Sequence, residues 1–308
     1  MRIFNTIPNA FPWIISSAAI LALIHPPIFT WFSGSLITLG LGGIMLGMGL
    51  TLRLSDFNEV RKTPSWFLTG FFLQFTVMPL FGWLLGYVFS LPPFFAVGLI
   101  LVSSCPGGTA SNVIVFLSKS NLALSVTMTT ISTIAAIVLT PLLTSNLSGN
   151  IIDVDAMGLF YSTLKVILIP IIFGVFINTK FPNYTESIKA YSPSFAVILI
   201  TLIVASIIGQ GKQIILSSGL SLLLAIMSLH MIGFVLGYFL SKLLLKNEAI
   251  SKTISIEVGM QNSGLGVVLA KENFVNPAVA IPSAISSLVH SLYGSIFVAI
   301  FRKKFNKL

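Results

Sequence analysis

Apolar runs of membrane-spanning length recur along the whole chain, and short polar or Pro/Gly-containing segments separate them. A helix that crosses a bilayer needs about 20 mostly apolar residues. The pattern predicts ten spans, which lie near residues 9–25, 35–52, 65–89, 94–118, 122–143, 157–178, 192–209, 214–241, 250–271 and 277–300. The runs are too long for membrane strands and lack the alternation of period two that such strands show. The sequence therefore predicts an all-α polytopic membrane protein.

Composition supports this prediction and narrows the function. The chain is 55% hydrophobic and 8% charged, whereas soluble domains carry about 25% charged residues. The net charge of +9 does not indicate a nucleic-acid-binding protein, because the basic residues lie in short loops and form no basic face interleaved with aromatics. The single cysteine, Cys105, excludes an internal disulfide and a cysteine-rich metal site. The N-terminal segment lacks a small-residue cleavage site, so we interpret it as the first span rather than a signal peptide.

The basic residues are unevenly distributed between the two ends of the predicted spans. All Lys and Arg residues except Lys165, Lys212 and Lys271 fall at the termini or in alternate loops. Lys212 and Lys271 fall in the opposite loops, and Lys165 lies inside the sixth span. Cytoplasmic loops of membrane proteins carry an excess of Lys and Arg. We therefore expect a multi-pass protein of the cell's inner (plasma) membrane with both termini in the cytoplasm.

Two predicted spans contain residues that disfavour a continuous helix. The fourth span includes "SSCPGGTASN" at 103–112, where Pro106 removes a backbone donor and Gly107 and Gly108 add flexibility. The ninth span includes "EVGMQNSG" at 257–264. We expect both helices to unwind there, although each interruption could alternatively be a kink that neighbouring helices tolerate.

The interruptions lie about half the chain length apart, which predicts two related halves. Residues 1–154 and 155–308 would each contain five spans. An odd number of spans places the two halves in opposite orientations. Paired interrupted helices in inverted repeats are typical of secondary transporters, which bind their substrates near the bilayer midplane. Unwound backbone survives at that depth only where protein or a water-filled cavity surrounds it.

Glu257 is the one acidic residue that we place within a span. A charge at the bilayer centre costs at least about 2.5–3.5 kcal/mol on insertion scales, so such a residue usually faces a partner or a cavity. Its expected surroundings are the oxygen-bearing side chains Gln74, Ser111, Asn112, Gln261, Asn262 and Ser263. Carboxylate, hydroxyl and carbonyl oxygens suit a hard cation and offer little to zinc or copper. The alternative is a protonated glutamate with a structural role.

The same interruptions indicate an anion site. A helix that begins at residues 109–112 would direct unpaired N–H groups and a positive dipole end into a cavity. Ser125 and Thr129 share one face of the fifth span, although such hydroxyls often bond only to backbone. A cation site beside an anion-binding helix end predicts cation-coupled uptake of an anionic solute.

Four stretches carry a resemblance to a known family: "QFTVMP" at 74–79, "GGTASNV" at 107–113, "ALSV" at 123–126 and "IEVGMQNSGL" at 256–265. Through them the chain resembles the bile acid–sodium symporter family, in particular bacterial homologues of the apical sodium-dependent bile acid transporter. The resemblance extends over essentially the whole chain. It implies a core of spans 3–5 and 8–10, a panel of spans 1, 2, 6 and 7, and a crossing of spans 4 and 9.

The resemblance also implies two coupling sodium ions and a substrate crevice. The first sodium site would contain Ser111, Asn112, Ser125, Thr129 and Glu257. The second would contain the side chains of Gln74 and Gln261 with backbone carbonyls of Glu257, Val258 and Met260. The substrate would lie between core and panel, near Thr109, Ala110, Asn262, His290 and Ser291.

One departure from the family pattern leaves the substrate open. Relatives often have a His–Asn pair in the tenth span, where this chain has His290 followed by Ser291. The shorter side chain would remove a substrate contact or enlarge the pocket, so the solute could be a bile-acid-like amphipathic carboxylate or a small carboxylate such as pantoate or a keto acid. His290 and His230 could alternatively be buried structural histidines.

Other classes remain as rivals at this stage. An intramembrane enzyme is disfavoured because the HExxH and GxSxG motifs are absent. A passive channel is disfavoured because the glutamate and the helix breaks cluster at one depth rather than forming a repeated pore ring. We expect a monomeric transporter that is not an enzyme.

Overall fold

The computed structural model describes residues 7–52, 61–149, 151–217 and 219–305. Within these residues the chain forms helices and no β-strand. Six helical segments are long and apolar enough to cross a membrane: Pro64–Val88, Leu122–Ser148, Ala156–Lys180, Ser192–Gln210, Leu220–Leu245 and Pro277–Ile300. Three shorter apolar helices accompany them. The prediction of an all-α membrane protein is confirmed.

The elements follow one another with short connections. In chain order they are η1 (Pro8–Ala10), α2 (Phe11–Ile24), α3 (Pro27–Thr30), α4 (Ser35–Thr51), α6 (Pro64–Val88), α7 (Pro93–Ser103), α8 (Ala110–Leu117), α9 (Leu122–Ser148), α10 (Ala156–Lys180), α11 (Pro182–Lys189), α12 (Ser192–Gln210), α13 (Lys212–Ser217), α14 (Gly219–Leu245), α15 (Glu248–Gly259), α16 (Ser263–Asn273), η3 (Pro277–Ala280) and α17 (Ile281–Phe305).

The helices match the predicted apolar runs, with differences at several of them. The run 94–118 contains two helices, α7 and α8, and the run 250–271 contains α15 and α16. Helix α9 continues to Ser148, beyond the predicted end at 143, because the hydroxyl residues of its last turns are buried inside the protein. The run 214–241 begins with the separate short helix α13.

Four helices begin where an Asn or Asp side chain caps the first turn. In α9, α10, α15 and α16 the side-chain oxygen accepts a hydrogen bond from the backbone N–H three residues later, and the capping residues are Asn121, Asp155, Asn247 and Asn262. Such caps satisfy one of the free N–H groups at a helix start and contribute about 1 kcal/mol. They explain why helices resume immediately after short polar segments.

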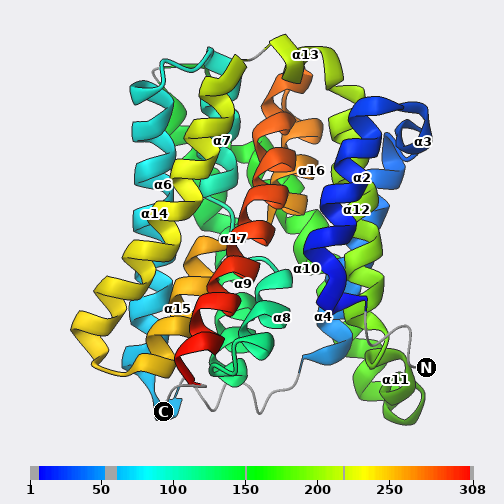
Figure 1. The fold of residues 1–308 in the computed structure, drawn as a ribbon. Coiled ribbons are helices and arrows are strands. Elements are labelled where there is room, and N and C mark those ends of the chain that lie inside the picture. The colour runs from blue at the N-terminus through cyan, green and yellow to red at the C-terminus, as the bar shows by residue number, and fades with distance from the viewer. Residues whose placement is uncertain (1–6, 53–60, 150, 218, 306–308) are drawn as a thin grey trace.

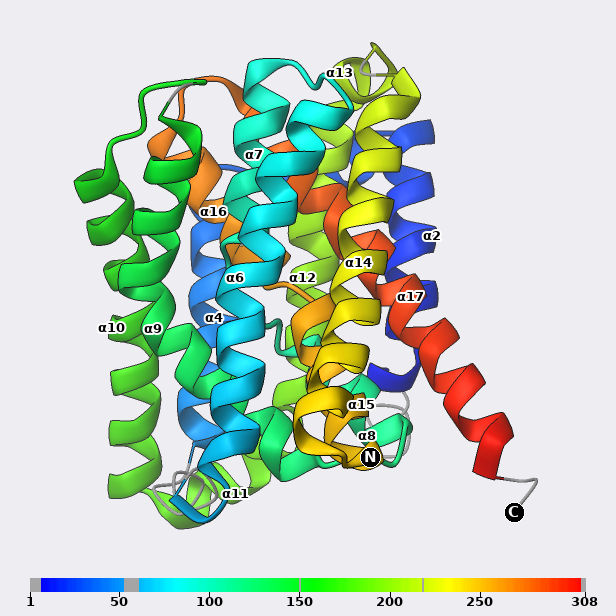
Figure 2. The same ribbon diagram turned by 90° about the vertical axis from the view of Figure 1, so that its left-hand side faces the viewer.

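Figures 1 and 2 show that the helices form two groups. The smaller group contains α2, α4, α10 and α12, with α4 against α10 and α12, and α12 against α2. The larger group contains α6–α9 and α14–α17, with α14 against α15, α6 and α17. Helices α8 and α15 lie at the lower end of the larger group in Figure 1, and α16 lies in its upper half.

The turn between α14 and α15 is held by a small polar cluster. Glu248 accepts hydrogen bonds from Lys242 Nζ at 2.6 Å and from the Tyr238 hydroxyl at 2.8 Å. The hydrogen bond from Lys242 is the main cause that lowers the pKa of Glu248, to about 2. Since Glu248 is partly exposed, water screens this ion pair, and exposed pairs contribute little to stability. The cluster connects the last turns of α14 to the first residue of α15, the helix that carries Glu257.

Helices α4 and α10 approach closely because glycines face one another. A Cβ added to Gly49 would overlap the Ile171 carbonyl oxygen, and one added to Gly174 would lie 2.5 Å from the Leu46 carbonyl oxygen. Small residues are typical of close contacts between membrane helices. By contrast, a Cβ added to Gly42, also in α4, meets no atom within 4 Å.

We therefore predict opposite outcomes for two alanine substitutions in one helix. Gly49→Ala forces α4 and α10 apart and should destabilise the protein by about 1–3 kcal/mol, the usual effect of overpacking. Gly42→Ala fills open space and should leave stability unchanged or slightly raised. Apparent melting temperatures of the purified variants measure this difference. Equal melting of Gly49→Ala and Gly42→Ala would contradict the close packing of α4 on α10.

Candidate functional site

The two interrupted segments meet and pair through their backbones. The N–H of Gly108 donates to the Met260 carbonyl at 2.8 Å, and the N–H of Asn262 donates to the Pro106 carbonyl at 2.8 Å. Between these bonds Gly107 and Gln261 form an isolated antiparallel bridge. A segment that has left its helix thus obtains its hydrogen bonds from the other segment, which satisfies polar backbone at membrane depth.

Gly108 is required for this approach. A Cβ at position 108 would lie 2.6 Å from the Gln261 carbonyl oxygen, which is a backbone atom and cannot move independently. At the neighbouring Gly107 the added Cβ would lie 2.9 Å from Glu257 Oε2. The two glycines therefore bring the α7–α8 connection against both the α15–α16 connection and the buried carboxylate.

Hydroxyl groups from two other helices surround the Glu257 carboxylate. Glu257 is 1% exposed. Its Oε1 accepts hydrogen bonds from Ser111 Oγ of α8 and Ser125 Oγ of α9, both at 2.5 Å, and its Oε2 accepts one from Thr129 Oγ1 of α9 at 2.8 Å. Glu257 has no basic partner within the described part of the chain. The charge is therefore met by neutral dipoles alone.

The cluster contains more accepting oxygens than protons to share. Ser125 Oγ lies 2.5 Å from Glu257 Oε1 and 2.7 Å from the Asn112 Oδ1 atom. A hydroxyl has one proton, so it can donate to one of these acceptors at a time. A hard cation coordinates such oxygens without needing a donor. This donor set of carboxylate, hydroxyl and amide oxygens fits a small hard cation.

A second polar cluster lies where α6 meets the crossing. Gln74 Nε2 lies 2.9 Å from Gln261 Oε1 and 3.0 Å from the Cys105 carbonyl, and Gln261 Nε2 donates to the Val258 carbonyl at 3.1 Å. Gln74 Oε1 is fully buried and accepts no hydrogen bond from the described residues. An unpaired buried polar atom costs about 1–3 kcal/mol, so an accepting oxygen in this position favours a bound cation.

The structure brings together most of the residues predicted for cation binding. One group contains Ser111, Asn112, Ser125, Thr129 and Glu257. The other contains Gln74, Gln261 and the Val258 carbonyl. The Met260 carbonyl already accepts from Gly108, although its second lone pair is available. Among the described residues no group of three or more His, Cys, Asp or Glu side chains could hold a metal ion.

A cavity of about 1280 Å³ lies between the two groups of helices. Its polar wall comes from α8, α9, α16 and α17 and includes Thr109, Ala110, Asn112, Asn262, Ser263 and His290. Its apolar wall comes from α2, α4 and α12 and includes Phe11, Ile44, Met48, Val197 and Ile200. Asn112 and Thr129 belong to both the cavity wall and the Glu257 cluster. The cation-type cluster is thus adjacent to the cavity.

Two helices begin at the polar wall of this cavity. Thr109 and Ala110 lie at the start of α8, and Asn262 and Ser263 lie at the start of α16. Asn262 Oδ1 caps α16, while its Nδ2 is buried and has no acceptor among the described residues. Helix N-termini carry a partial positive charge and free N–H groups. The wall therefore offers donors and positive potential to a bound solute.

Ser291 is the exception among the predicted substrate residues. It is fully buried, does not line the cavity, and donates a hydrogen bond to the Ser287 carbonyl of its own helix at 2.6 Å. Four positions upstream, Ser287 lies on the cavity wall together with His290. The Ser291 side chain is therefore directed away from this cavity, and its effect on the substrate stays a prediction.

Sequence reasoning missed the connection between two histidines. His230 Nδ1 lies 2.8 Å from the Gly259 carbonyl and its Nε2 lies 2.6 Å from Ser286 Oγ. Ser263 Oγ lies 3.1 Å from both Ser286 Oγ and His290 Nε2. The spacing of Ser286 and His290, four residues apart on one helical face, was an available signal.

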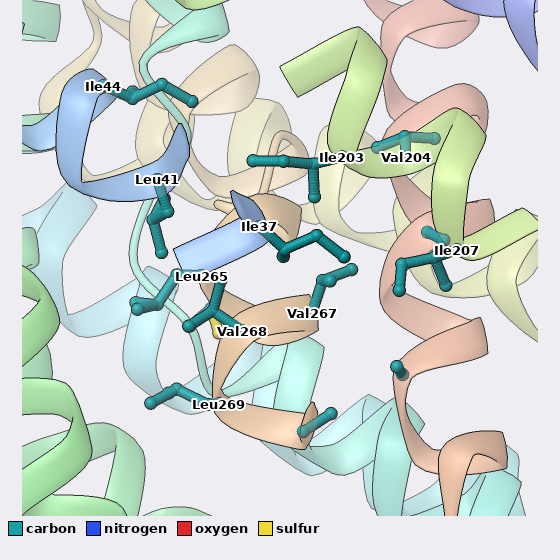
Figure 3. Packing of buried hydrophobic residues seen from close by; sticks show 14 of the residues in the cluster. Ile37, Leu41, Ile44, Ile203, Val204, Ile207, Leu265, Val267, Val268 and Leu269 are labelled. Carbon is teal, nitrogen blue, oxygen red and sulfur yellow. The ribbon is translucent and has the colours of Figure 1, made fainter. Parts of the chain in front are cut away.

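The cavity occupies one end of the space between the two groups of helices. In α4 it is lined by Ile44, Met48 and Thr51, and Lys62 and Lys189 also line it. Beyond Ile44 the space is filled by apolar side chains of α4, α12 and α16, such as those of Leu41 and Leu265 (Figure 3). The cavity is therefore closed on the side that lies beyond Ile44.

Two hydrogen bonds join the groups at this closed end. Thr38 Oγ1 donates to Glu272 Oε1 at 2.9 Å, and Ser162 Oγ lies 3.1 Å from Asn273 Oδ1. Thr38 and Thr51 are 13 residues apart in α4, which corresponds to about 20 Å along the helix axis. The part of the cavity lined by Thr51 and the closed end thus lie toward opposite ends of α4.

Comparisons with known proteins decide the family. The model of the Sodium Bile acid symporter family matches residues 38–218. The chain belongs to this family. It is 44% identical to the Arabidopsis thaliana protein named probable sodium/metabolite cotransporter BASS1, chloroplastic, over 98% of this chain and 76% of the relative. It is also 44% identical to the Bacillus subtilis protein named uncharacterized sodium-dependent transporter YocS, over 96% of this chain and 91% of the relative.

A third relative belongs to the same set. The Oryza sativa subsp. japonica protein named probable sodium/metabolite cotransporter BASS2, chloroplastic, is 45% identical over 92% of this chain and 68% of the relative. The three relatives are named as transporters and not as enzymes. The predicted family and the prediction that the protein is not an enzyme are confirmed.

The close approach of the two paired segments predicts that one methyl group added at position 108 lowers stability. Gly108→Ala should push the Gln261 backbone away and disrupt the pairing of residues 106–108 with 260–262, because the added Cβ has no space. Each buried backbone group left unpaired costs about 1–3 kcal/mol. We expect a lower apparent melting temperature than for wild type, with Gly42→Ala as the control. Unchanged melting of Gly108→Ala would contradict the crossing geometry.

Proposed function

We propose that the protein is a sodium-coupled symporter that takes up an organic anion by alternating access. The observation that carries this proposal is the position of the Glu257 cluster directly beside the donor-rich wall of the cavity. A cation bound among these oxygens would lie next to a solute bound at the wall. Coupling then needs no long-range transmission, because both sites share the segments that cross.

The first sodium ion would bind Glu257 with Ser111, Asn112, Ser125 and Thr129. The proposal is supported by the hydroxyls that already point their oxygens at the carboxylate and by the surplus of acceptors around Ser125 Oγ. A sodium ion would neutralise the carboxylate at membrane depth, where an isolated charge is unfavourable. Ligands from α8, α9 and α15 would be drawn together by this ion.

The second sodium ion would bind at Gln74 and Gln261, with carbonyls of Glu257, Val258 and Met260. Support comes from Gln74 Oε1, a buried oxygen without a donor in the described residues. These ligands lie on α6 and on the segment after α15, so the ion would fix the unwound segment that contributes to the cavity wall. Two ions would thus order both connections at the crossing.

An anionic solute is supported by the two helix N-termini and by the free Nδ2 donor of Asn262. Thr109 and Ala110 of α8 would face the same group of the solute, and His290 would contact it from α17. The apolar opposite wall favours an amphipathic molecule, since binding sites combine apolar surface with a few placed polar groups. A bile-acid-like carboxylate fits the cavity volume of about 1280 Å³.

A smaller carboxylate is the second candidate substrate. Three relatives are named sodium/metabolite or sodium-dependent transporters, and these names do not include a bile acid. The polar groups of the wall lie at the starts of α8 and α16 and would be sufficient for a compact acid such as pantoate or a keto acid. The apolar half of the cavity would then contain water.

In the proposed architecture, α7–α8 and α15–α16 are the interrupted spans of two inverted five-helix repeats, residues 1–154 and 155–308. The larger group of helices acts as the core and the smaller group as the panel. The protein would be a monomer in the inner (plasma) membrane with both termini cytoplasmic. The cavity then opens inward, because Lys62 and Lys189, which line it, belong to the basic loops.

The first test of this proposal measures the effect of sodium on stability in the absence of any solute. At equal ionic strength, sodium should raise the apparent melting temperature of the purified wild type relative to potassium, because a ligand that binds only the folded state stabilises it by RT ln(1 + [L]/Kd). At 100 times Kd this amounts to about 2.7 kcal/mol. Glu257→Gln should lose the sodium-specific rise, since the neutral amide does not balance the charge of the ion.

Matched threonine variants separate the cation site from general packing. Thr129→Val removes a hydroxyl that reaches Glu257, whereas Thr163→Val removes a buried hydroxyl that bonds only to the Leu159 carbonyl of its own helix. Thr129→Val should reduce the sodium-specific rise and Thr163→Val should retain it. Equal melting of the wild type in sodium and potassium would contradict sodium binding at this site.

The second test of this proposal measures transport of a solute. Proteoliposomes with an inward sodium gradient should accumulate at least one labelled carboxylate from a panel of a bile acid, pantoate and a keto acid, and accumulation should stop when potassium replaces sodium. Asn262→Leu should raise KM for that solute at least tenfold, because it removes the free donor at the wall. Equilibration without accumulation would instead indicate a passive channel.

A further inference from the structure

A chain of hydrogen bonds links the last residue of α15, the helix that carries Glu257, to the cavity through two buried histidines. It runs from the Gly259 carbonyl through His230 and Ser286 to Ser263 and His290. The two imidazole rings lie 5.3 Å apart, edge to face. The five residues come from α14, α15, α16 and α17, so the chain crosses four helices at the level of the crossing. We call these residues the histidine relay.

The chemistry of the groups fixes the direction of the first two protons in this relay. The Gly259 carbonyl can only accept, so His230 Nδ1 carries a proton. A neutral His230 then accepts at Nε2 and receives the hydrogen of the Ser286 hydroxyl. Neutral rings are expected because both are buried and adjacent, and a second charge would be unfavourable there.

The same reasoning continues to the cavity. Since Ser286 has used its only proton, its oxygen accepts from Ser263. If Ser263 gives its proton to Ser286, the hydrogen bond at the 3.1 Å contact with His290 requires the proton on His290 Nε2. In the arrangement in which every contact of the relay is a hydrogen bond, the two histidines therefore have opposite tautomers: Nδ1–H in His230 and Nε2–H in His290. This arrangement depends on each hydrogen bond of the relay. If one is removed, the remaining hydroxyl and imidazole groups can place their protons differently.

We propose that His230 is a positioning residue that couples sodium occupancy to the orientation and tautomer of the cavity-facing His290. Gly259 is the last residue of α15, two positions after Glu257 and next to Met260, whose carbonyl pairs with Gly108. An ion that orders this segment moves or fixes the Gly259 carbonyl. His230 follows that carbonyl, and Ser286 and Ser263 pass the change to His290. The proposal rests on sodium binding at Glu257, as proposed above.

The relay can be observed directly because the chain has only three histidines. Protein labelled with ¹⁵N-histidine gives three imidazole signals, and the exposed His25 at the end of α2 serves as an internal reference. Nitrogen shifts distinguish the two tautomers. We expect Nδ1–H for His230 and Nε2–H for His290 in potassium, and a shift of the His290 signals by more than one linewidth when sodium replaces potassium.

Variants test whether the response travels through His230. In His230→Phe and in Ser286→Ala, sodium should still raise the melting temperature, whereas the His290 signals should lose their sodium response. Ser286→Ala is the safer substitution if His230→Phe does not fold. The matched control is Ser241→Ala in α14, which removes a buried hydroxyl that bonds only within its own helix. It should keep both the melting response and the His290 response.

Each other outcome has a defined meaning. A wild type whose melting responds to sodium while its His290 signals do not would overturn the coupling role. A full His290 response in both His230→Phe and Ser286→Ala would also overturn it, as would loss of the sodium melting response in either variant, because the residue would then belong to the cation site itself. A wild type without any sodium effect on melting would refute the proposed function, and equal tautomers in the two histidines would refute the relay.

Discussion

The pairing of two interrupted backbone segments is the constraint on which the rest of this structure depends. Hydrocarbon offers no partner for free N–H and C=O groups, so a helix can unwind within a membrane only where another part of the protein supplies them. Here the bonds from Gly108 to Met260 and from Asn262 to Pro106 do so in both directions. The close approach requires glycine at position 108. Once the crossing exists, two helix starts and a buried carboxylate are brought to one place.

The buried carboxylate is surrounded by hydroxyl groups and has no countercharge within the described residues. Glu257 is surrounded by hydroxyls from α8 and α9, and no cation of the described chain balances its charge. A basic residue in place of these hydroxyls would neutralise the carboxylate permanently, so the site would no longer favour a cation. Neutral hydroxyl groups compensate the charge of the carboxylate only in part. That incomplete compensation is what a reversible ion site requires, since the ion must both bind and leave.

Sequence patterns predicted the helices well because membrane-length apolar runs have few alternative structures. They also predicted interruptions of the fourth and ninth runs, where the structure has separate helices, since Pro106, Gly107 and Gly108 cannot easily continue a helix. The contacts between distant residues were less accessible. Position 291 was predicted to face the substrate, yet its side chain turns to the Ser287 carbonyl, because rotation along α17 directs it away from the cavity. The bond between His230 and the Gly259 carbonyl depends on how α14 packs on α15, which no local pattern encodes.

The shape of the cavity constrains how coupling can occur. Two kinds of contact form its closed end. Apolar side chains of α4, α12 and α16 pack together, and Thr38–Glu272 and Ser162–Asn273 are hydrogen-bonded. Both kinds of contact join α16 to the smaller group of helices, and α16 begins at Asn262, directly after the crossing. An ion that orders the crossing would therefore act on the helix that also forms the closed end. The donor wall and the closed end share α16, and the proposed sodium ligand Gln261 lies directly before the Asn262 cap of this helix, so an ion bound there would act on both through one helix.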